Sequence, residues 1–353
     1  MRTLSGTGER PNPTPKSQSA PSGRGSKAKG GLTRLLREEL SAAAMVLTGI
    51  AGRPTMLPAA RRSSQRSKLP PPGEFFRVED GMVHVLRKGD RGAGPTVILE
   101  SGAFGVVSTW AWIQDAISRR ARVIAYDRPG LAWSDPISGS RDAATMARHL
   151  RSLLHDANER GPFILVGHSL GGMFARMFAH QFPEDVAGMV LVDSSHPDQF
   201  HYTGGVIHSF ITSFLPALAR LGVCRAAGTF GDLVEGLPDR QREEVSTFLA
   251  SGRHLTAACA ELDALNETVS QLRDAGDLGD KPLYVLTASA GRTGETALWH
   301  ILQRDLKALS SEGRLRRIKD ATHSSLLTKQ EHASAVVAAV LEVIDQVDAQ
   351  AAA

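Results

Sequence analysis

Ser169 has the sequence context that covalent catalysis by a serine requires. It is the serine of a G-x-S-x-G stretch that follows the apolar run 163–166 and precedes a helix predicted from about Leu170. In a strand–turn–helix context this pattern is a nucleophile elbow, which presents the hydroxyl at the carboxyl end of a strand. The alternative is a chance surface turn. The buried strand before the motif and the small residues after it argue against that alternative.

A serine hydroxyl is a weak nucleophile at neutral pH and needs an adjacent base. Among the 12 histidines we favour His323, which follows the last predicted strand and precedes the last helix. It should therefore lie at the same edge of the sheet as Ser169. We interpret His168 as support for the turn, while His196 and His201 are weaker alternatives for the base.

The base in turn needs a buried carboxylate to orient it, and the sequence leaves three candidates open. We favour Asp193, because it emerges directly from a buried strand and is held rigidly. Glu295 is the alternative acid in the loop after strand 283–287, and Asp198 is a third. The structural alternative for Asp193 is that it only caps the next turn.

An oxyanion formed at the serine needs two preorganised N–H donors. We expect one from Leu170, the residue after the nucleophile. We expect the other from Ala103, in the loop after the strand that ends at Leu99. Both are backbone groups, so the identity of either side chain should matter little.

The elements that must position these residues alternate along the chain. Apolar runs predict strands at 96–99, 123–126, 163–166, 189–192, 283–287 and 315–318, after a hairpin at 75–87. Helices between them predict an α/β fold with a mostly parallel sheet covered on both faces. The candidate residues follow strand ends, which is where such sheets bind ligands.

Residues 194–279 interrupt this alternation, because they predict several helices with no strand between them. We interpret them as a helical lid inserted after the sixth core strand, in a core made of residues 73–193 and 280–353. The first part of the lid is apolar, either for its own packing or for contact with substrate. The residues expected to line a substrate pocket are Phe104, His168, Phe200 and Phe210.

The net charge of +4 is unevenly distributed over the 353 residues. Residues 1–72 hold 13 Lys and Arg against 3 acidic residues, a net charge of +10, so the rest carries −6. Nucleic-acid binding requires a basic face on a folded domain, so we expect no nucleic-acid partner. The Pro-, Ser- and Gly-rich residues 1–31 predict disorder, and residues 32–52 predict a short helix.

The uncharged part of that helix has 13 residues, too few to span a bilayer. The helix either lies on a membrane surface or packs on the body, and we expect a cytoplasmic protein. The two cysteines, Cys224 and Cys259, are expected to be free, buried thiols. The sequence contains no C-x-x-C pair and no H-E-x-x-H motif, so we expect no metal. Covalent catalysis by a serine needs no cofactor, so we expect none.

Several of these stretches together resemble the α/β-hydrolase family, over about residues 73–347. The matching motifs are E-S-G-A-F from Glu100, Y-D-R-P-G-L-A-W-S-D from Tyr126, V-G-H-S-L-G-G from Val166, V-L-V-D ending at Asp193 and D-A-T-H ending at His323. The resemblance implies the chain order serine, acid, histidine. It also implies an esterase-like or lipase-like serine hydrolase that uses a catalytic triad and an acyl-enzyme, on a small or medium apolar ester.

Two departures from the family pattern affect the site. The usual His-Gly of the oxyanion loop is Ser101-Gly102 here, and the usual aspartate after the seventh core strand is missing. The epoxide hydrolases and dehalogenases of this family have an aspartate in the elbow. Ser169 disfavours their chemistry for this chain. Thioester, amide or C–C bond hydrolysis on the same site remain alternatives, as does a non-catalytic ligand-binding protein on the same scaffold.

Overall fold

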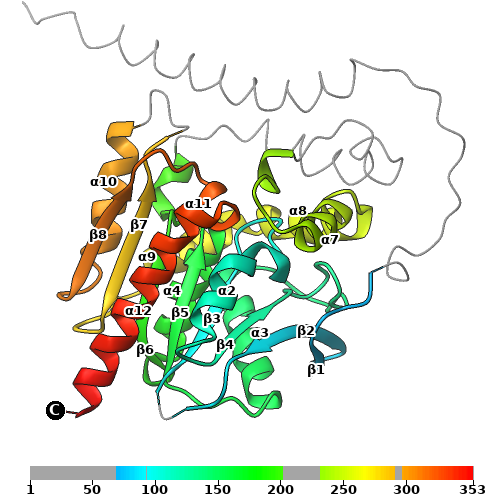
Figure 1. The fold of residues 1–353 in the computed structure, drawn as a ribbon, viewed down its shortest axis with the longest axis horizontal. Coiled ribbons are helices and arrows are strands. Elements are labelled where there is room, and N and C mark those ends of the chain that lie inside the picture. Colours follow the sequence, from blue (N-terminus) through cyan, green and yellow to red (C-terminus); the bar gives the residue numbers. More distant parts are fainter. Residues whose placement is uncertain (1–68, 93, 202–230, 291–295, 353) are drawn as a thin grey trace, which may run out of the picture. The chain divides into compact units, whose positions relative to one another are not determined.

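The computed structural model describes residues 69–352 except residues 93, 202–230 and 291–295 (Figure 1). Within these residues the strands form one sheet in the order β1-β2-β4-β3-β5-β6-β7-β8. The strands are β1 (Glu74–Val78), β2 (Gly81–Lys88), β3 (Thr96–Glu100), β4 (Val123–Tyr126), β5 (Phe163–His168), β6 (Val186–Val192), β7 (Leu283–Ala288) and β8 (Gly313–Ile318). The first two pairings are antiparallel and the rest are parallel, which confirms the predicted α/β fold.

Helices cover both faces of the sheet (Figure 1). One face carries α2 (Ala111–Ile117), α11 (Ser325–Thr328) and α12 (Gln330–Ala352). The other carries α3 (Ala143–Asp156), α4 (Leu170–Gln181), α9 (Leu265–Arg273) and α10 (Thr296–Lys307). None of the described helices is both long enough and apolar enough to cross a membrane.

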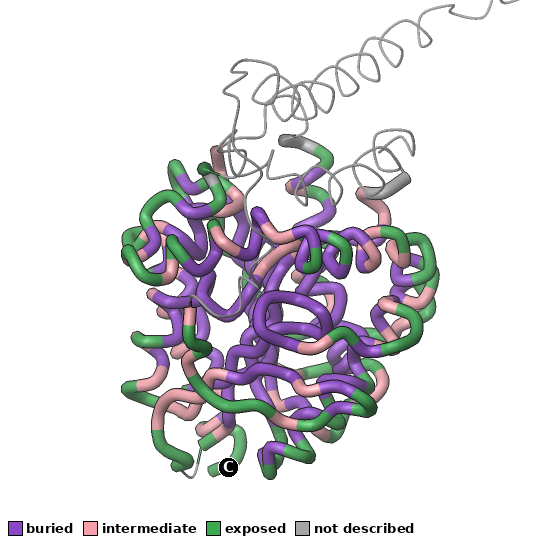
Figure 2. Tube along the Cα trace, turned by 90° about the vertical axis from the view of Figure 1, so that its right-hand side faces the viewer, coloured by how far each residue is buried: buried purple, intermediate pink, exposed green. Residues whose placement is uncertain are grey.

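The central strands are apolar throughout because both of their faces are covered. In β5, Phe163 and Leu165 pack into the core on the side of α3 and α4, while Ile164 and Val166 pack on the side of α2 and α12. This alternation follows from the two-residue period of a strand. Figure 2 shows the resulting continuous buried interior.

The described elements of the segment after β6 are all helical. The segment contains the 3₁₀ turns η4 (Pro197–His201) and η5 (Gly231–Leu233), then α7 (Asp239–Leu249), α8 (Gly252–Asp263) and α9. Cys259 of α8 is a free, buried thiol, and burial raises its pKa to about 12. Phe210 and Cys224 lie outside the described residues, as do the side chains of Phe200 and His201. The role of this segment as a lid stays a prediction.

Contacts with the body begin before the predicted boundary at residue 73. Trp133 Nε1 donates a hydrogen bond to the carbonyl oxygen of Leu69 at 3.2 Å, and His84 Nε2 donates to that of Pro72. The Pro-rich stretch therefore lies against the body rather than apart from it. The predicted tail, residues 1–68, lies outside the described residues.

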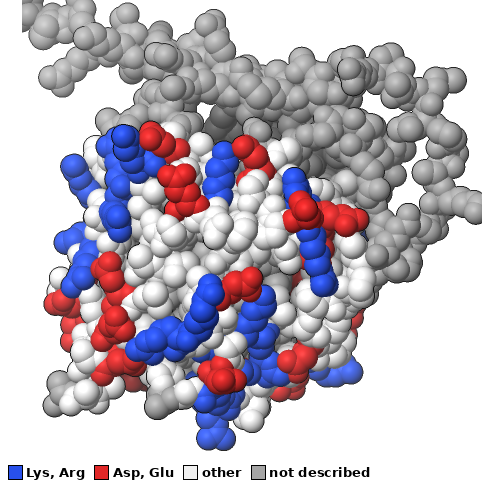
Figure 3. Space-filling model, in the orientation of Figure 1, with Lys and Arg blue, Asp and Glu red and all other residues white. Residues whose placement is uncertain are grey.

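Charged side chains on the body are mixed in sign, and basic and acidic groups alternate over the face in Figure 3.

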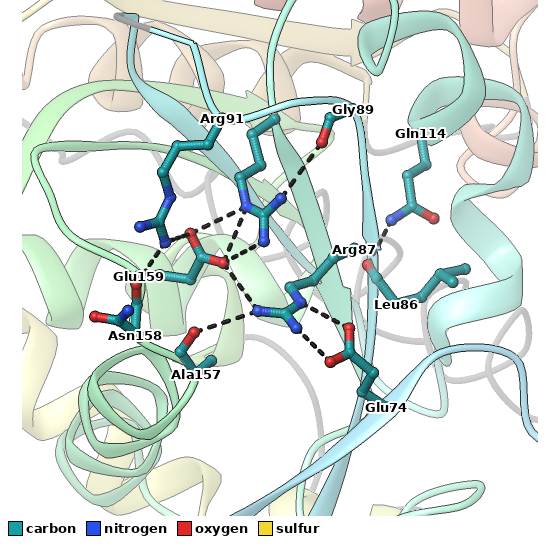
Figure 4. A network of polar contacts seen from close by, with 10 residues as sticks. Glu74, Leu86, Arg87, Gly89, Arg91, Gln114, Ala157, Asn158 and Glu159 are labelled. Atoms are coloured by element: carbon teal, nitrogen blue, oxygen red, sulfur yellow. Dashed lines mark hydrogen bonds and ion pairs between the residues drawn. The ribbon is translucent and has the colours of Figure 1, made fainter.

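Near the amino ends of the parallel strands, three arginines surround the buried carboxylate of Glu159 (Figure 4). Its oxygens lie 2.6 Å from Arg122 Nη2, 2.8 Å from Arg91 Nη2 and 3.3 Å from Arg87 Nη1. Burial opposes ionisation of Glu159, but the arginine hydrogen bonds outweigh it and lower the pKa.

The elbow leaves no room for a side chain at Gly171. A Cβ there would lie 2.3 Å from the carbonyl oxygen of Glu100 and 2.5 Å from that of Ser101, and backbone cannot yield as a side chain can. We predict that Gly171→Ala lowers the free energy of unfolding by about 3 kcal/mol, measured by urea denaturation. Gly276→Ala is the control, since a Cβ there meets no atom within 4 Å. Equal stability of the two variants would contradict the packing described for the elbow.

Candidate active site

Ser169 occupies the turn between β5 and α4, where the G-x-S-x-G pattern predicts it. Its backbone has φ +53° and ψ −124°, a sparsely populated conformation that costs about 1–3 kcal/mol and persists only when its surroundings impose it. The end of β6 supplies part of that restraint. The Ser169 N–H donates to the Val192 carbonyl oxygen at 3.2 Å, and the Ser195 N–H donates to the Ser169 carbonyl oxygen at 3.1 Å.

Asp193 follows β6 and is fully buried, and both of its carboxylate oxygens accept hydrogen bonds. Oδ2 lies 2.7 Å from His323 Nδ1. Oδ1 accepts from Thr287 Oγ1 and the Ala288 N–H, each at 3.0 Å, and from Trp299 Nε1 at 3.3 Å. A carboxylate can only accept, so Nδ1 of a neutral His323 carries the proton. Nε2 is then the unprotonated nitrogen, which is the form that a general base requires.

The sheet order explains how an acid after β6 reaches this histidine. β6 and β7 are neighbours, and the Asp193 N–H donates to the Leu286 carbonyl oxygen of β7 at 2.7 Å. The end of β7, where the resemblance places an aspartate, instead carries Thr287 and Ala288, which donate to Asp193. Asp193 thus supplies the carboxylate that the family pattern places after β7. Thr287 and Ala288, at the end of β7, hold that carboxylate in place.

The other candidate acids and bases are placed differently. The half-exposed side chain of Asp198 lies 3.5 Å from Arg273 Nη2, and His196 Nε2 lies 3.1 Å from Asp305 Oδ2. Glu295 lies outside the described residues. Of the carboxylates proposed from the sequence and described here, Asp193 is the one hydrogen-bonded to His323.

His168 links the elbow to the loop that carries His323. Its Nε2 donates to the carbonyl oxygen of His323 at 3.1 Å, and the centroids of the two rings are 4.5 Å apart. Since His168 immediately precedes Ser169, these contacts bring the predicted nucleophile and base to one place on the sheet edge. His323 has 41% of its side chain exposed, so a reactant can reach it.

Residues 101–105, here called the β3 loop, lie directly beside Ser169. A Cβ on Gly102 would be 3.0 Å from the Ser169 Cβ. The Gly105 N–H donates to the Gly102 carbonyl oxygen at 3.1 Å, which closes a turn, and Phe104 has φ +60° at the third position of that turn. A positive φ there is typical of a type II turn and is normally occupied by glycine, so Phe104 is strained.

Neither of the two predicted N–H donors bonds to another residue that the structure describes. Within the described part of the chain, the Ala103 N–H donates no hydrogen bond. Leu170 is the first residue of α4, so its N–H has no acceptor within the helix. Both groups flank Ser169, and both are free to bind an oxygen of a reactant.

A small cavity of about 60 Å³ opens beside the β3 loop, and its exposed lining is mainly apolar. Phe104 and His168, both predicted to line a substrate pocket, contribute to it. Val245 and Leu249 of α7 also line it. The full lining is Gly102, Ala103, Phe104, Gly105, Thr109, His168, Leu233, Val245, Leu249, Ser324, Leu327 and Thr328.

Sequence reasoning missed the buried polar residues that hold the β3 loop. His254 of α8 accepts from the Ala132 N–H at 3.1 Å through Nδ1 and donates to the Phe104 carbonyl oxygen at 3.2 Å through Nε2. Arg128 and Glu261 lie beside it and are also buried. The available signal was the spacing of His254 and Glu261, which puts two polar side chains on the same face of α8.

Comparison with known proteins gives a consistent assignment of the fold. A family model described as "alpha/beta hydrolase fold" matches residues 95–330. An uncharacterized protein of Schizosaccharomyces pombe is 25% identical over 290 residues, covering 74% of this chain and 54% of that protein. This chain therefore spans about half the length of that relative.

Two solved structures illustrate the range of chemistry on this fold. A putative lipase of Acinetobacter baumannii has a TM-score of 0.62 and 19% identity, over 83% of this chain and 100% of that one. A mutant of a putative epoxide hydrolase of Pseudomonas aeruginosa has a TM-score of 0.61 and 18% identity, over 79% and 98%. At these identities the likeness shows the fold alone.

The contacts of His254 predict an acid-dependent loss of stability. Burial lowers the pKa of His254 to about 4, so the folded state holds it neutral, whereas the unfolded state takes up a proton near pH 6.5. Its contribution to stability is complete above pH 6.5 and is lost as the pH falls toward 4. By linkage, the loss between pH 7.5 and pH 5 is about 2 kcal/mol.

His254→Gln removes this titration, because a glutamine amide offers both an acceptor and a donor. We expect urea unfolding to show a fall in stability between pH 7.5 and pH 5 that is about 2 kcal/mol smaller in His254→Gln than in the parent. All other titrating groups are common to both proteins and cancel in the comparison. The same fall in both proteins would show that His254 is not held neutral.

Proposed function

This chain belongs to the alpha/beta hydrolase family, and from this premise we propose that it is a serine hydrolase that cleaves carboxylic esters of small apolar acyl groups. The observation that supports this most is the 2.7 Å hydrogen bond between buried Asp193 and His323, beside the strained turn at Ser169. A serine, a histidine with its tautomer fixed and a buried carboxylate, in that geometry, are the parts of a catalytic triad.

The proposed reaction begins when His323 Nε2 takes the proton of the Ser169 hydroxyl. The oxygen of Ser169 attacks the ester carbonyl carbon, and the negative charge moves to the carbonyl oxygen. The N–H groups of Leu170 and Ala103 stabilise that oxyanion. The intermediate then collapses, the alcohol leaves with the proton from His323, and an acyl-enzyme remains at Ser169.

Water completes the cycle by the same route. His323 takes a proton from a water molecule, whose oxygen attacks the acyl carbon. The second tetrahedral intermediate releases the carboxylic acid and returns the proton to Ser169. In both halves the charge of Asp193 stabilises the imidazolium that forms at His323, and its burial makes that interaction stronger than it would be in water.

Two features support an ester substrate with a small apolar group. The cavity beside Ala103 is small, and apolar side chains such as Val245, Leu249 and Leu327 form much of its wall, so it would take a short hydrocarbon chain. An alkyl-enzyme ester, the intermediate of enzymes with an aspartate in the elbow, would need a carboxylate where this chain has Ser169. The serine therefore favours acyl transfer over epoxide opening.

We predict that Ser169→Ala reduces kcat by about 10⁴-fold or more with p-nitrophenyl butyrate, because the acyl-enzyme can no longer form. A fluorophosphonate probe should label the parent and leave the variant unlabelled. A parent protein that neither hydrolyses esters nor reacts with the probe would contradict the proposed function and favour a non-catalytic role.

We predict that Asp193→Asn reduces kcat by about 10³–10⁴-fold, because an amide holds His323 in the wrong tautomer and does not stabilise its positive charge. Asp198→Asn is the matched control, since Asp198 pairs with Arg273 at the surface, and its kcat should change less than about 3-fold. Steady-state kinetics of both variants on one ester test this assignment. Comparable losses in the two variants would refute the role given to Asp193.

A further inference from the structure

Arg128 is a buried cation that contacts the β3 loop and two carboxylates at once. With 1% of its surface exposed, it lies between Glu100, at the end of β3, and Glu261, on α8. Nη1 donates to Glu100 Oε1 at 2.8 Å, while Nε and Nη2 donate to the two oxygens of Glu261 at 2.8 and 2.7 Å. The pairing with Glu261 is the forked, two-point arrangement that only arginine can form.

The same guanidinium also binds the backbone of the β3 loop. Nη2 donates to the Gly102 carbonyl oxygen at 2.9 Å, and Nη1 donates to the Ser101 carbonyl oxygen at 2.5 Å. In a trans peptide the C=O and the following N–H point in opposite directions. Fixing the Gly102 carbonyl toward Arg128 therefore aims the Ala103 N–H away from Arg128, in the opposite direction within the peptide plane.

The β3 loop needs such restraint because its conformation is strained. Phe104 holds a positive φ that costs a non-glycine residue free energy. α8 opposes this strain at two points, through Glu261 by way of Arg128 and through His254 Nε2, which donates to the Phe104 carbonyl oxygen at 3.2 Å. Two side chains of one helix therefore restrain the β3 loop, one directly and one through Arg128.

We propose that Arg128 is a positioning residue for the oxyanion hole, and that Glu261 sets the position of Arg128. On this view α8, in the helical segment after β6, controls catalysis without touching the substrate. The proposal rests on the proposed serine hydrolase function. It goes further in assigning the orientation of the Ala103 donor to a buried ion pair that joins this segment to the core.

The structural alternative is that these charges only stabilise the fold. The chain offers a matched comparison in the Glu159 cluster of Figure 4, where arginines also surround a buried carboxylate. Arg87 and Arg91 of that cluster donate to the carbonyl oxygens of Ala157 and Asn158, before β5 and far along the strands from Ser169. If buried ion pairs act only through stability, the two clusters should respond alike.

Three variants separate these possibilities: Arg128→Lys, which keeps the charge but loses the forked donors, Glu261→Gln, and Glu159→Gln as the control. Each is measured for kcat and KM on p-nitrophenyl butyrate, for thermal stability, and for affinity toward a trifluoromethyl ketone, which forms an oxyanion on Ser169. For Arg128→Lys and Glu261→Gln we expect kcat to fall about 10²-fold, the loss typical of one oxyanion donor, with KM changed less than about 3-fold.

The affinity for the ketone should fall by about the same factor as kcat, whereas Glu159→Gln should lose stability but keep both. Activity that falls in all three variants only in proportion to their unfolded fraction would overturn the proposal. A rise in KM at unchanged kcat for Arg128→Lys and Glu261→Gln would also overturn it. A parent enzyme without esterase activity would instead refute the proposed function, and that result is visible before any variant is made.

Discussion

The hydrogen bond between Asp193 and His323 joins two positions 130 residues apart in the chain, and the rest of the fold is consistent with keeping it in place. It requires β6, β7 and β8 to lie side by side with their carboxyl ends at one edge. A fully buried carboxylate is costly unless its oxygens are hydrogen-bonded. Thr287, Ala288 and Trp299 meet that requirement, so neighbouring elements offset the cost of burying a charge at the site.

A second buried charge lies across the same edge, with the opposite sign. Arg128 sits among backbone carbonyls and two carboxylates. Burial lowers the pKa of its guanidinium, but the charges and hydrogen bonds of Glu261 and Glu100 outweigh burial and leave the pKa raised. Buried ion pairs often contribute little net stability, because desolvation offsets the attraction. Here the ion pairs of Arg128 contribute orientation instead, because hydrogen bonds in a low-dielectric interior hold backbone groups in fixed positions. Asp193 orients a side chain and Arg128 orients a peptide.

Much of the fold could be predicted because parallel strands covered on both faces are apolar throughout. Strand β4 has the predicted limits, and the other core strands differ by a few residues at their ends. The positions of Ser169 and His323 could be predicted because each follows a strand and lies at the carboxyl-end edge of the sheet. Asp193 could be favoured over Glu295 only on the grounds of rigidity, and the structure shows its hydrogen bonds without describing Glu295.

The contacts of α8 could not be predicted, for a physical reason. Glu261 and Arg128 are 133 residues apart, and their meeting depends on how α8 is rotated about its own axis. Periodicity gives the buried face of a helix but not the element that this face meets. The size of the cavity beside Phe104 depends in the same way on where α7 lies, which no local pattern encodes.

The spacing of His254 and Glu261 on α8 has a consequence for how such a protein can diversify. His254 and Glu261 lie two helical turns apart on α8, and both restrain the β3 loop, His254 directly and Glu261 through Arg128. Side chains of this segment that take no part in such contacts are then available for change without moving the β3 loop. A lineage could thus exchange side chains of this segment while inheriting the same backbone geometry beside Ser169.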